Sequence, residues 1–196
     1  MSTRSRITLK RLDGTNTSIY CHWDGYIENN GVLLQLCYDT PEKIEKLLKL
    51  GNLSSLYEYT DPNPNEEHSF EHPQKNVCIA YHRDRGEELE FWSDEQEFNY
   101  TFDESIGAWI VEREKYDCIK SCVINSEYEY RTYKTSFLID EILKYQDNIL
   151  KYWVDDEFAT KENLIKTLTE KAGAQVRIAN QRRAEEYDAW YRAYCD

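Results

Sequence analysis

The short patterns that mark many cofactor-dependent and hydrolytic enzymes are missing from this chain. It has only seven glycines in 196 residues, and it contains no glycine-rich phosphate loop, no GxSxG elbow and no HExxH pair. No run of about eighteen apolar residues is present, so we expect no membrane span. The first residues alternate with charge and form no apolar export segment, so we expect a cytoplasmic protein.

Disulfides and metal sites are not expected either, although the chain has six cysteines and four histidines. It contains no CxxC, and Cys118 and Cys122 offer only one closely spaced pair, whereas zinc needs a second pair. A chain of this length does not need disulfides to fold, so the thiols are interpreted as free and mostly buried. His68 and His72 stand in a polar loop, where exposed histidines usually bind nothing. We therefore predict no cofactor and no metal.

What the chain does have is aromatic residues, including sixteen tyrosines and five tryptophans. Such a composition is typical of a folded protein. Two alternating stretches, residues 6–12 and 18–23, flank Asp13 and Gly14, which predicts a β-hairpin with a tight turn. Residues 28–38 are predicted to be a helix. A second helix is predicted to start at Thr40 and Pro41 and to end at Gly51.

Later stretches predict further strands and then helices. Residues 77–82 form a compact apolar run typical of a buried strand, and residues 97–102 and 108–113 alternate like two antiparallel strands. Residues 127–133 alternate as well. From residue 136 the apolar period becomes helical, and residues 161–171 and 174–194 continue it.

These patterns together predict an α+β fold. A small antiparallel sheet with two short helices is expected over residues 1–134, followed by a C-terminal helical extension over residues 135–196. The aromatic residues near the chain end, among them Tyr187 and Trp190, are expected to pack on the preceding helices. A homodimer through the C-terminal helices is the alternative.

The net charge of −13 is unevenly distributed. Residues 1–56 carry seven basic and six acidic residues, whereas residues 57–104 carry three basic and fourteen acidic ones. Such a charge repels phosphate backbones, so direct binding to nucleic acid is not expected. The same charge would steer the protein toward a basic partner surface.

The densest stretch is the acidic segment, residues 87–104, which holds eight acidic residues and no basic one. Aromatic residues are interleaved with these acids, and carboxylates beside aromatic rings match a groove built for phosphates and stacked bases. The alternative is a strand and its approach, with rings inward and carboxylates in solvent. The residues predicted to face a partner are Glu87, Glu88, Glu90, Trp92, Asp94, Glu95, Glu97, Tyr100, Asp103 and Glu104.

Two strings share the pattern His-x-Asp followed closely by glycine. They are His22 with Asp24, and His82 with Asp84. On an extended chain, residues two apart project from the same face, so each histidine would lie beside its aspartate. If the two strands pair, all four side chains would converge at one end of the sheet. Such a cluster would suit a metal site or acid–base hydrolysis.

A structural role for these strings is the favoured interpretation. His22 and Asp24 would then stabilise a turn through polar contacts. Arg83 and Arg85 would pair with Asp84, Glu87 or the acidic segment. In the hydrolytic alternative those arginines would bind an anion. The polar cluster around the two strings is completed by Trp23, Tyr26, Arg83 and Arg85.

Three strings also carry a resemblance to a family of proteins from phages, prophages and mobile elements. They are Tyr-Cys-His-Trp-Asp-Gly-Tyr at residues 20–26, Gly-Asn-Leu-Ser-Ser-Leu at 51–56, and Ala-Tyr-His-Arg-Asp-Arg-Gly-Glu at 80–87. The resemblance covers residues 4–111 and implies a mobile-element origin. Small acidic proteins from such elements often inhibit host defence nucleases, and anti-CRISPR proteins are among them.

The resemblance and the charge pattern lead to one functional expectation. The protein is expected to bind and inhibit a host nucleic-acid-binding defence protein in an anti-CRISPR-like manner, by contacting its basic surface and without catalysis. The alternative is a metal-dependent or acid–base hydrolase that uses the paired His-x-Asp strings.

Overall fold

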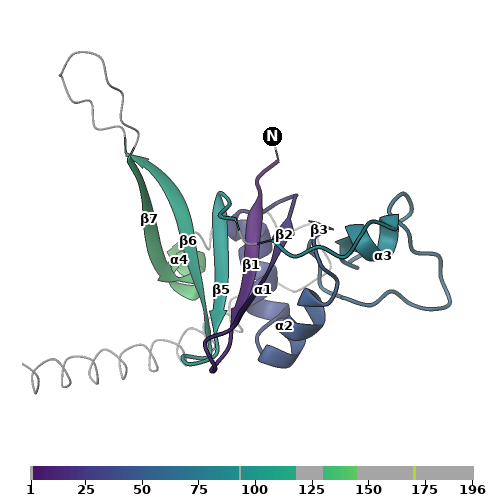
Figure 1. Cartoon of the computed structure of the whole chain (residues 1–196), viewed down its shortest axis with the longest axis horizontal. Helices are drawn as coiled ribbons and strands as arrows, with labels where there is room; N and C mark the ends of the chain where they lie inside the picture. The colour runs from purple at the N-terminus through teal and green to yellow at the C-terminus, as the bar shows by residue number, and fades with distance from the viewer. Residues whose placement is uncertain (1, 93, 118–129, 145–169, 171–196) are drawn as a thin grey trace, which may run out of the picture.

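The computed structural model describes residues 2–92, 94–117, 130–144 and 170, and it has an α+β fold (Figure 1). Its strands form one seven-stranded sheet with the order β4-β3-β2-β1-β5-β6-β7. The strands are β1 (Ser5–Lys10), β2 (Asn16–Cys21), β3 (Leu53–Ser55), β4 (Ile79–Ala80), β5 (Phe98–Asp103), β6 (Ala108–Asp117) and β7 (Tyr130–Phe137). The helices are the π-helical turn η1 (Ile27–Gly31), α1 (Val32–Cys37), α2 (Pro41–Leu48), α3 (Tyr81–Arg85) and α4 (Leu138–Lys144).

The N-terminal hairpin is confirmed. Strands β1 and β2 pair antiparallel, with Ile7 opposite Ile19. Gly14 has a φ of 84°, which the turn requires and which glycine adopts without steric cost. The side chain of Asp13 accepts a hydrogen bond from the Thr15 N–H at 2.8 Å, so the turn residues also hold each other.

The sheet is mixed, which corrects the prediction of an antiparallel one, while the α+β class is confirmed. Strand β1 pairs parallel with β5, and β2 meets β3 in parallel at Cys21 and Leu53. The connection between β2 and β3 explains their parallel pairing. It contains η1, α1 and α2, which return the chain to the other end of the sheet before β3 begins, as a parallel pairing requires. The predicted antiparallel pair of residues 97–102 and 108–113 is confirmed as β5 and β6.

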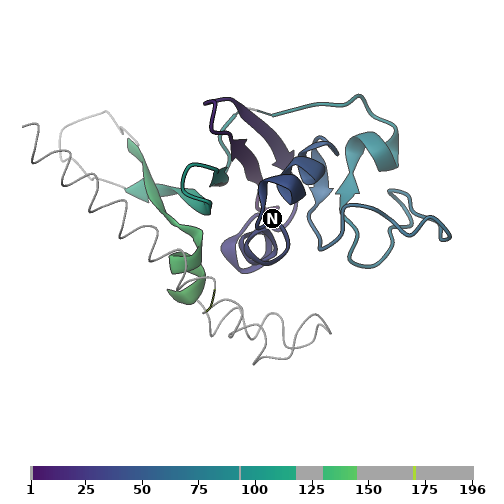
Figure 2. The ribbon, with the colours of Figure 1, turned by 90° about the horizontal axis from the view of Figure 1, so that it is seen from below.

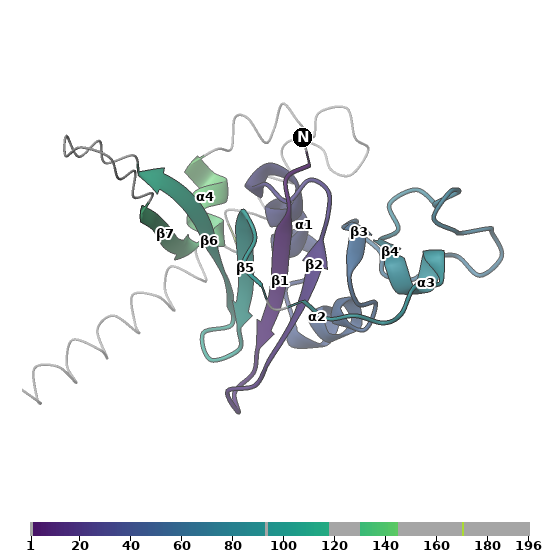
Figure 3. The same ribbon diagram turned by 45° about the horizontal axis from the view of Figure 1, so that its top comes forward.

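Helices α1, α2 and α4 cover one face of the sheet, and the hydrophobic core lies between these helices and the sheet, whereas α3 lies at the β4 edge (Figure 3). Alternate residues of the central strands, such as Ile7 and Leu9, are fully buried there. The two largest buried side chains, Trp109 and Tyr100, also have hydrogen-bond partners for their polar atoms. The hydroxyl of Tyr100 donates to the Gly25 carbonyl at 2.8 Å, and the Trp109 indole N–H donates to the Tyr38 carbonyl at 2.8 Å.

Both predicted N-terminal helices are present. Helix α2 begins as expected, with the Thr40 hydroxyl accepting from the Lys43 N–H and with Pro41 as first helical residue. Three residues beyond its end, Gly51 has a φ of 70° and lets the chain turn into β3. The predicted helix at residues 28–38 starts as the π-helical turn η1 before it continues as α1.

The helix predicted from residue 136 appears as α4, and it belongs to the core. Leu138, Ile139 and Ile142 are fully buried, and Glu141 is buried in ion pairs with Arg113 and Lys144, each at 2.9 Å. The expected division at residue 134 falls inside β7. The helices predicted at residues 161–171 and 174–194, and a dimer formed through them, lie outside the described residues apart from residue 170.

None of the helices in the described part of the chain has the length and apolar character needed to cross a bilayer.

Candidate functional site

The first part of the acidic segment, described at residues 87–92 and 94–97, crosses the sheet on the face opposite helices α1, α2 and α4 (Figure 2). It has no regular secondary structure, but its backbone is held at three points. The Glu87 N–H donates to the Tyr81 carbonyl at 3.2 Å, and the Trp92 N–H donates to the Ser18 carbonyl at 3.0 Å. Between them, the Glu90 carbonyl accepts from the Asn52 N–H at 3.2 Å. We call residues 87–92 and 94–97 the crossing loop, and these three hydrogen bonds hold the backbone of residues 87–92.

Most side chains of the crossing loop face solvent. Leu89 is 45% exposed, Phe91 53% and Trp92 37%. Glu87 pairs with Arg85 at 3.2 Å. The other acidic side chains are exposed, and no basic side chain among the described residues pairs with them. They are Glu88, Glu90, Asp94, Glu95 and Glu97. Within the described part of the chain, the loop thus combines acidic side chains that have no basic partner with exposed apolar surface, and we call these five the uncompensated acids.

Three of the residues predicted to face a partner belong to the fold instead. Tyr100 is fully buried, because it lies on the helix-covered side of β5, so its predicted place on a partner-facing surface is wrong. Asp103 is also buried and forms an ion pair with the Lys10 ammonium at 2.8 Å, so the same prediction is wrong for it. Glu104 is partly exposed, and its carboxylate accepts from the Leu12 N–H at 2.9 Å.

A small pocket of about 200 Å³ lies between the crossing loop and the edge of β2. Three aromatic residues line it, namely Tyr20, Tyr81 and Trp92. The centroids of the Tyr20 and Trp92 rings are 5.6 Å apart, and the ring planes are tilted by 46°. Its other lining residues are polar or acidic: Asn52, His82, Glu87, Glu88 and Glu90. We call this hollow the aromatic pocket.

Asn52 joins the elements that form the aromatic pocket. Its side-chain oxygen accepts from the Tyr20 N–H at 2.9 Å, and its carbonyl accepts from the Tyr81 N–H at 3.1 Å. Its own N–H donates to the Glu90 carbonyl. One nearly buried residue therefore fixes β2, the start of α3 and the crossing loop relative to one another.

The two tyrosines of the aromatic pocket are hydrogen-bond donors at neutral pH. Burial raises the pKa of both Tyr20 and Tyr81, so the phenols stay protonated. The Tyr20 hydroxyl lies 2.7 Å from Nδ1 of His22, and the His22 ring packs edge-on against Trp23. His22 therefore positions a wall of the pocket.

A second, wider hollow of about 630 Å³ lies on the open face of the sheet, beside the crossing loop. Its floor is formed by hydroxyl, amide and basic side chains of β1, β2 and β5, and its wall by aromatic rings. Two basic residues, Arg6 and Lys10, contribute to the floor, and Lys10 is paired with Asp103. The lining residues are Arg6, Thr8, Lys10, Asn16, Thr17, Ser18, Phe91, Trp92 and Thr101.

The expected convergence of the two His-x-Asp strings does not form. The predicted strand at residues 77–82 is only two residues long in β4, and the chain enters α3 at Tyr81. Residues two apart on a helix point to opposite sides, so His82 lines the aromatic pocket while Asp84 does not. Strand β3 also separates β2 from β4, so the two strands do not pair.

The first string is also bent. Asp24 has a φ of 54°, so the chain turns after His22 and the two residues do not share an extended strand. Asp24 is exposed, and its backbone carbonyl accepts from the Asn30 N–H at 3.3 Å. Of the four residues in the hydrolytic hypothesis, only His82 reaches the aromatic pocket.

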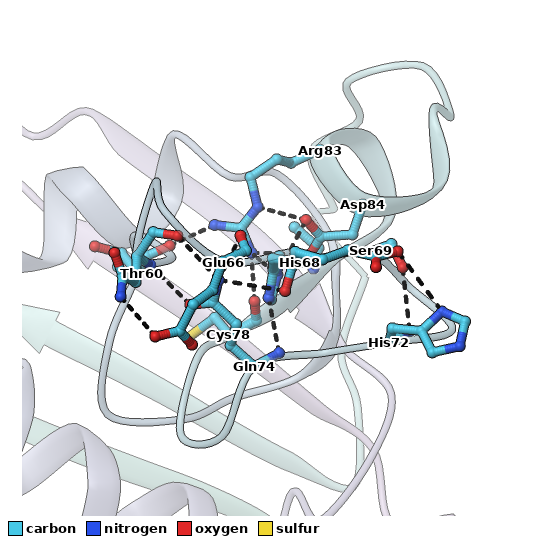
Figure 4. A network of polar contacts seen from close by, with 12 residues as sticks. Thr60, Glu66, His68, Ser69, His72, Gln74, Cys78, Arg83 and Asp84 are labelled. Atoms are coloured by element: carbon cyan, nitrogen blue, oxygen red, sulfur yellow. Dashed lines mark hydrogen bonds and ion pairs between the residues drawn. The ribbon is translucent and has the colours of Figure 1, made fainter.

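Asp84 is instead the centre of a buried polar network (Figure 4). Its side chain is 1% exposed and accepts from the Arg83 guanidinium at 2.5 and 2.8 Å and from the Ala80 N–H at 2.7 Å. Arg83 also donates to the carbonyls of Thr60 and Cys78. This confirms the predicted pairing of Arg83 with Asp84 and of Arg85 with Glu87.

His68 completes this network. The Gln74 N–H donates to its Nδ1 at 3.1 Å, and its Nε2 lies 3.2 Å from Asp84 and 2.9 Å from the Arg83 guanidinium. Both ring nitrogens are thus engaged. Burial alone raises the pKa of Asp84, but the hydrogen bonds from Arg83 and Ala80 outweigh it and hold the pKa below its usual value. The network ties the polar loop before β4 to α3.

The remaining candidates for chemistry are the cysteines and the other loop histidine. Burial raises the pKa of Cys21 to about 12 and also raises that of Cys78, so neither thiol is a nucleophile at neutral pH. His72 is exposed and lies 3.9 Å from Glu67. Across the described residues, no three histidine, cysteine or acidic side chains gather as a metal site requires.

The sequence interpretation missed Tyr81 and Asn52. Both stand inside strings that carried the family resemblance, which was the available signal. The polar cluster predicted around the strings is split, since Arg83 and Arg85 belong to α3 and its contacts, whereas Trp23 and Tyr26 follow β2. Comparisons with protein-family models, curated proteins and solved structures gave no match.

Proposed function

We propose that this protein is a non-enzymatic inhibitor that binds the basic groove of a host nucleic-acid-binding defence protein, in the manner of an anti-CRISPR protein. The observation that carries the proposal is the crossing loop. It presents five exposed carboxylates that have no basic partner among the described residues, beside the exposed rings of Phe91 and Trp92. We place the encounter in the cytoplasm of the host cell.

The chemistry of the crossing loop supports this choice of partner. A protein that needs only solubility usually mixes charges of both signs, whereas this loop carries one sign. A groove that binds nucleic acid offers basic side chains for phosphates and flat apolar surfaces for bases. Carboxylates and aromatic rings on one chain segment match both kinds of surface. The three backbone hydrogen bonds reduce the ordering cost that a flexible loop would pay on binding.

The positions of the His-x-Asp residues favour binding over hydrolysis. A hydrolase needs a base and its orienting carboxylate within hydrogen-bond reach. Here Asp84 is enclosed with Arg83 and His68, and Asp24 lies in an exposed turn.

The test is affinity capture from host lysate with three forms of the full chain. One is wild type. The second replaces the five uncompensated acids of the crossing loop: Glu88→Gln, Glu90→Gln, Asp94→Asn, Glu95→Gln and Glu97→Gln. The control removes five acids from the loop before β4: Glu58→Gln, Asp61→Asn, Glu66→Gln, Glu67→Gln and Glu71→Gln. We expect wild type and control to retain a nucleic-acid-binding protein and the second form to lose it.

Two further observations complete the test. Added salt should release the captured protein, because screening weakens exposed charge pairs. The purified partner should lose nucleic-acid binding when wild type is added. Capture of no nucleic-acid-binding protein, or equal capture by the form that lacks the loop charges, would contradict the proposal.

A further inference from the structure

We propose that the aromatic pocket is the anchoring site for one arginine side chain of a basic protein partner. This inference rests on the proposed function and specifies which group of the partner is recognised, and where. It concerns only the pocket lined by Tyr20, Tyr81, Trp92, His82, Glu88 and Glu90.

The size of the pocket selects a side chain. Its volume of about 200 Å³ is below the range of about 300–1,000 Å³ that is usual for pockets holding drug-sized molecules. A single long side chain fits such a space. Anchoring side chains at protein interfaces typically fill small, well-packed pockets of this kind, and arginine is one of the enriched anchors.

The walls of the pocket favour a flat cation. Trp92 and Tyr20 present two tilted rings whose centroids are 5.6 Å apart. A guanidinium stacks on tryptophan and tyrosine faces and is less strongly hydrated than an ammonium group. The fold already shows this preference close by, since the guanidinium carbon of Arg85 lies 5.0 Å from the centroid of the Phe70 ring.

The acceptors of the pocket match the donors of arginine. Glu88 and Glu90 are exposed, have no basic partner among the described residues, and line the pocket together. Carboxylates accept the guanidinium fork in a bidentate manner. His82 Nδ1 lies 2.7 Å from the Glu87 carbonyl, which can only accept, so the neutral ring carries its proton on Nδ1 and keeps Nε2 as an acceptor.

The pocket is also formed in advance of binding. Asn52 holds β2, α3 and the crossing loop through three hydrogen bonds, and His22 holds the Tyr20 hydroxyl. A partner arginine would therefore meet rings and carboxylates that are already in place, which lowers the entropic cost of binding. The wider hollow on the open face of the sheet offers no equivalent, because the basic side chains Arg6 and Lys10 line it and would repel a cation.

The experiment titrates the full chain with the peptide Ac-Gly-Arg-Gly-NH2 and follows amide and indole N–H signals by NMR. The Trp92 indole signal is assigned with Trp92→Phe. Two matched peptides carry lysine, or citrulline, which has the shape of arginine without its charge. We expect saturable shifts at Trp92 and at the backbone of residues 81–90, with the citrulline peptide binding at least about tenfold more weakly.

Two double variants distinguish the pocket from the general charge of the loop. Glu88→Gln with Glu90→Gln should weaken binding of the arginine peptide by about tenfold. Asp94→Asn with Glu95→Gln removes the same charge from the same loop outside the pocket, and should change binding by less than about twofold. All four side chains are exposed, and equal urea midpoints will verify that the fold is intact.

The inference is overturned if arginine and citrulline peptides bind equally, if lysine binds as tightly as arginine, if both double variants lose binding equally, or if the shifts lie elsewhere. Its failure is distinct from that of the proposed function. If lysate capture survives Glu88→Gln with Glu90→Gln, the partner binds without the pocket and only this inference fails. If the peptide binds in the pocket but no nucleic-acid-binding protein is captured, only the proposed function fails.

Discussion

Asp84 shows how one residue can look catalytic in sequence and be structural in the fold. It stands two residues after a histidine, yet the histidine it contacts is His68, far back in the polar loop. Its carboxylate accepts from Arg83 and from the Ala80 N–H, and it lies 3.2 Å from His68 Nε2, so it joins α3, β4 and the polar loop. The residue therefore closes the loop before β4 onto α3.

Replacing this carboxylate should destabilise the protein. In Asp84→Asn the partly buried Arg83 guanidinium loses its buried counter-ion, and breaking such a pair costs about 3 kcal/mol. The free energy of unfolding from urea denaturation at pH 7 is the measurement. Arg85→Gln is the control, since Arg85 is exposed and should cost less than about 1 kcal/mol. A loss at Asp84 no larger than at Arg85 would contradict the role of the network.

The same residue predicts a pH dependence. Its folded pKa lies below the ordinary value of 3.8, so the folded state releases the proton more readily than the unfolded chain. The resulting stability is fully present above that ordinary value and is lost as the pH falls through the folded pKa. Between pH 5 and pH 2, Asp84→Asn should therefore show a flatter loss of stability than wild type. Some slope will remain, because the pKa of Asp103 is lowered as well.

Among the elements, the short segment that enters β3 contacts several parts of the site. Gly51 sits where a Cβ would lie 2.6 Å from the Leu89 side chain and 3.0 Å from the Glu90 carbonyl. Asn52, the next residue, binds the crossing loop and both tyrosine-bearing elements. The closeness of the crossing loop to the sheet thus depends on the absence of a side chain at residue 51.

Gly51→Ala should loosen the crossing loop, and Gly14→Ala is its matched control. Both glycines have positive φ, 70° and 84°, so both substitutions carry a backbone penalty of about 1 kcal/mol. Only at Gly51 does the new methyl group meet another segment, because nothing lies within 4 Å at Gly14. Hydrogen exchange at residues 87–92 should accelerate in Gly51→Ala and stay unchanged in Gly14→Ala. Equal exchange in the two variants would show that the contact does not matter.

For the whole molecule, the dominant feature is the concentration of charge. Residues 57–104 carry a net −11 out of a total of −13, and the five uncompensated acids of the crossing loop lie close together in that region. Like charges crowded on one surface repel each other in the folded state. If the loop serves binding, its charge is expected to lower the free energy of unfolding, because residues kept for function often reduce the stability of the folded protein.

Neutralising those five acids should therefore stabilise the protein. We expect the free energy of unfolding at low salt to rise by about 1 kcal/mol, since each exposed charge contributes a few tenths. The gain should shrink as sodium chloride is added, because salt screens the repulsion in wild type. Urea denaturation at several salt concentrations measures both effects. A variant that is less stable than wild type at low salt would argue that the acids are paired within the fold.

The sequence alone determined the features that depend on near neighbours along the chain. The Asp13-Gly14 turn, the Thr40 cap with Pro41, and the alternating strands around residues 98–113 follow from local steric and hydrogen-bonding preferences. The α+β class follows from the succession of these elements, and the charge density of the acidic segment is a property of composition.

Only the tertiary structure decided which distant residues meet. The hydrophobic pattern of residues 77–82 does not distinguish a strand from the start of a helix. It therefore could not predict on which side of the chain the Asp84 side chain lies. Parallel pairing of β1 with β5 depends on crossover connections, which local patterns do not encode. The acidic segment was evident from the sequence, but burial separated Tyr100 and Asp103 from the exposed acids, and packing against Tyr20 and Tyr81 formed the aromatic pocket.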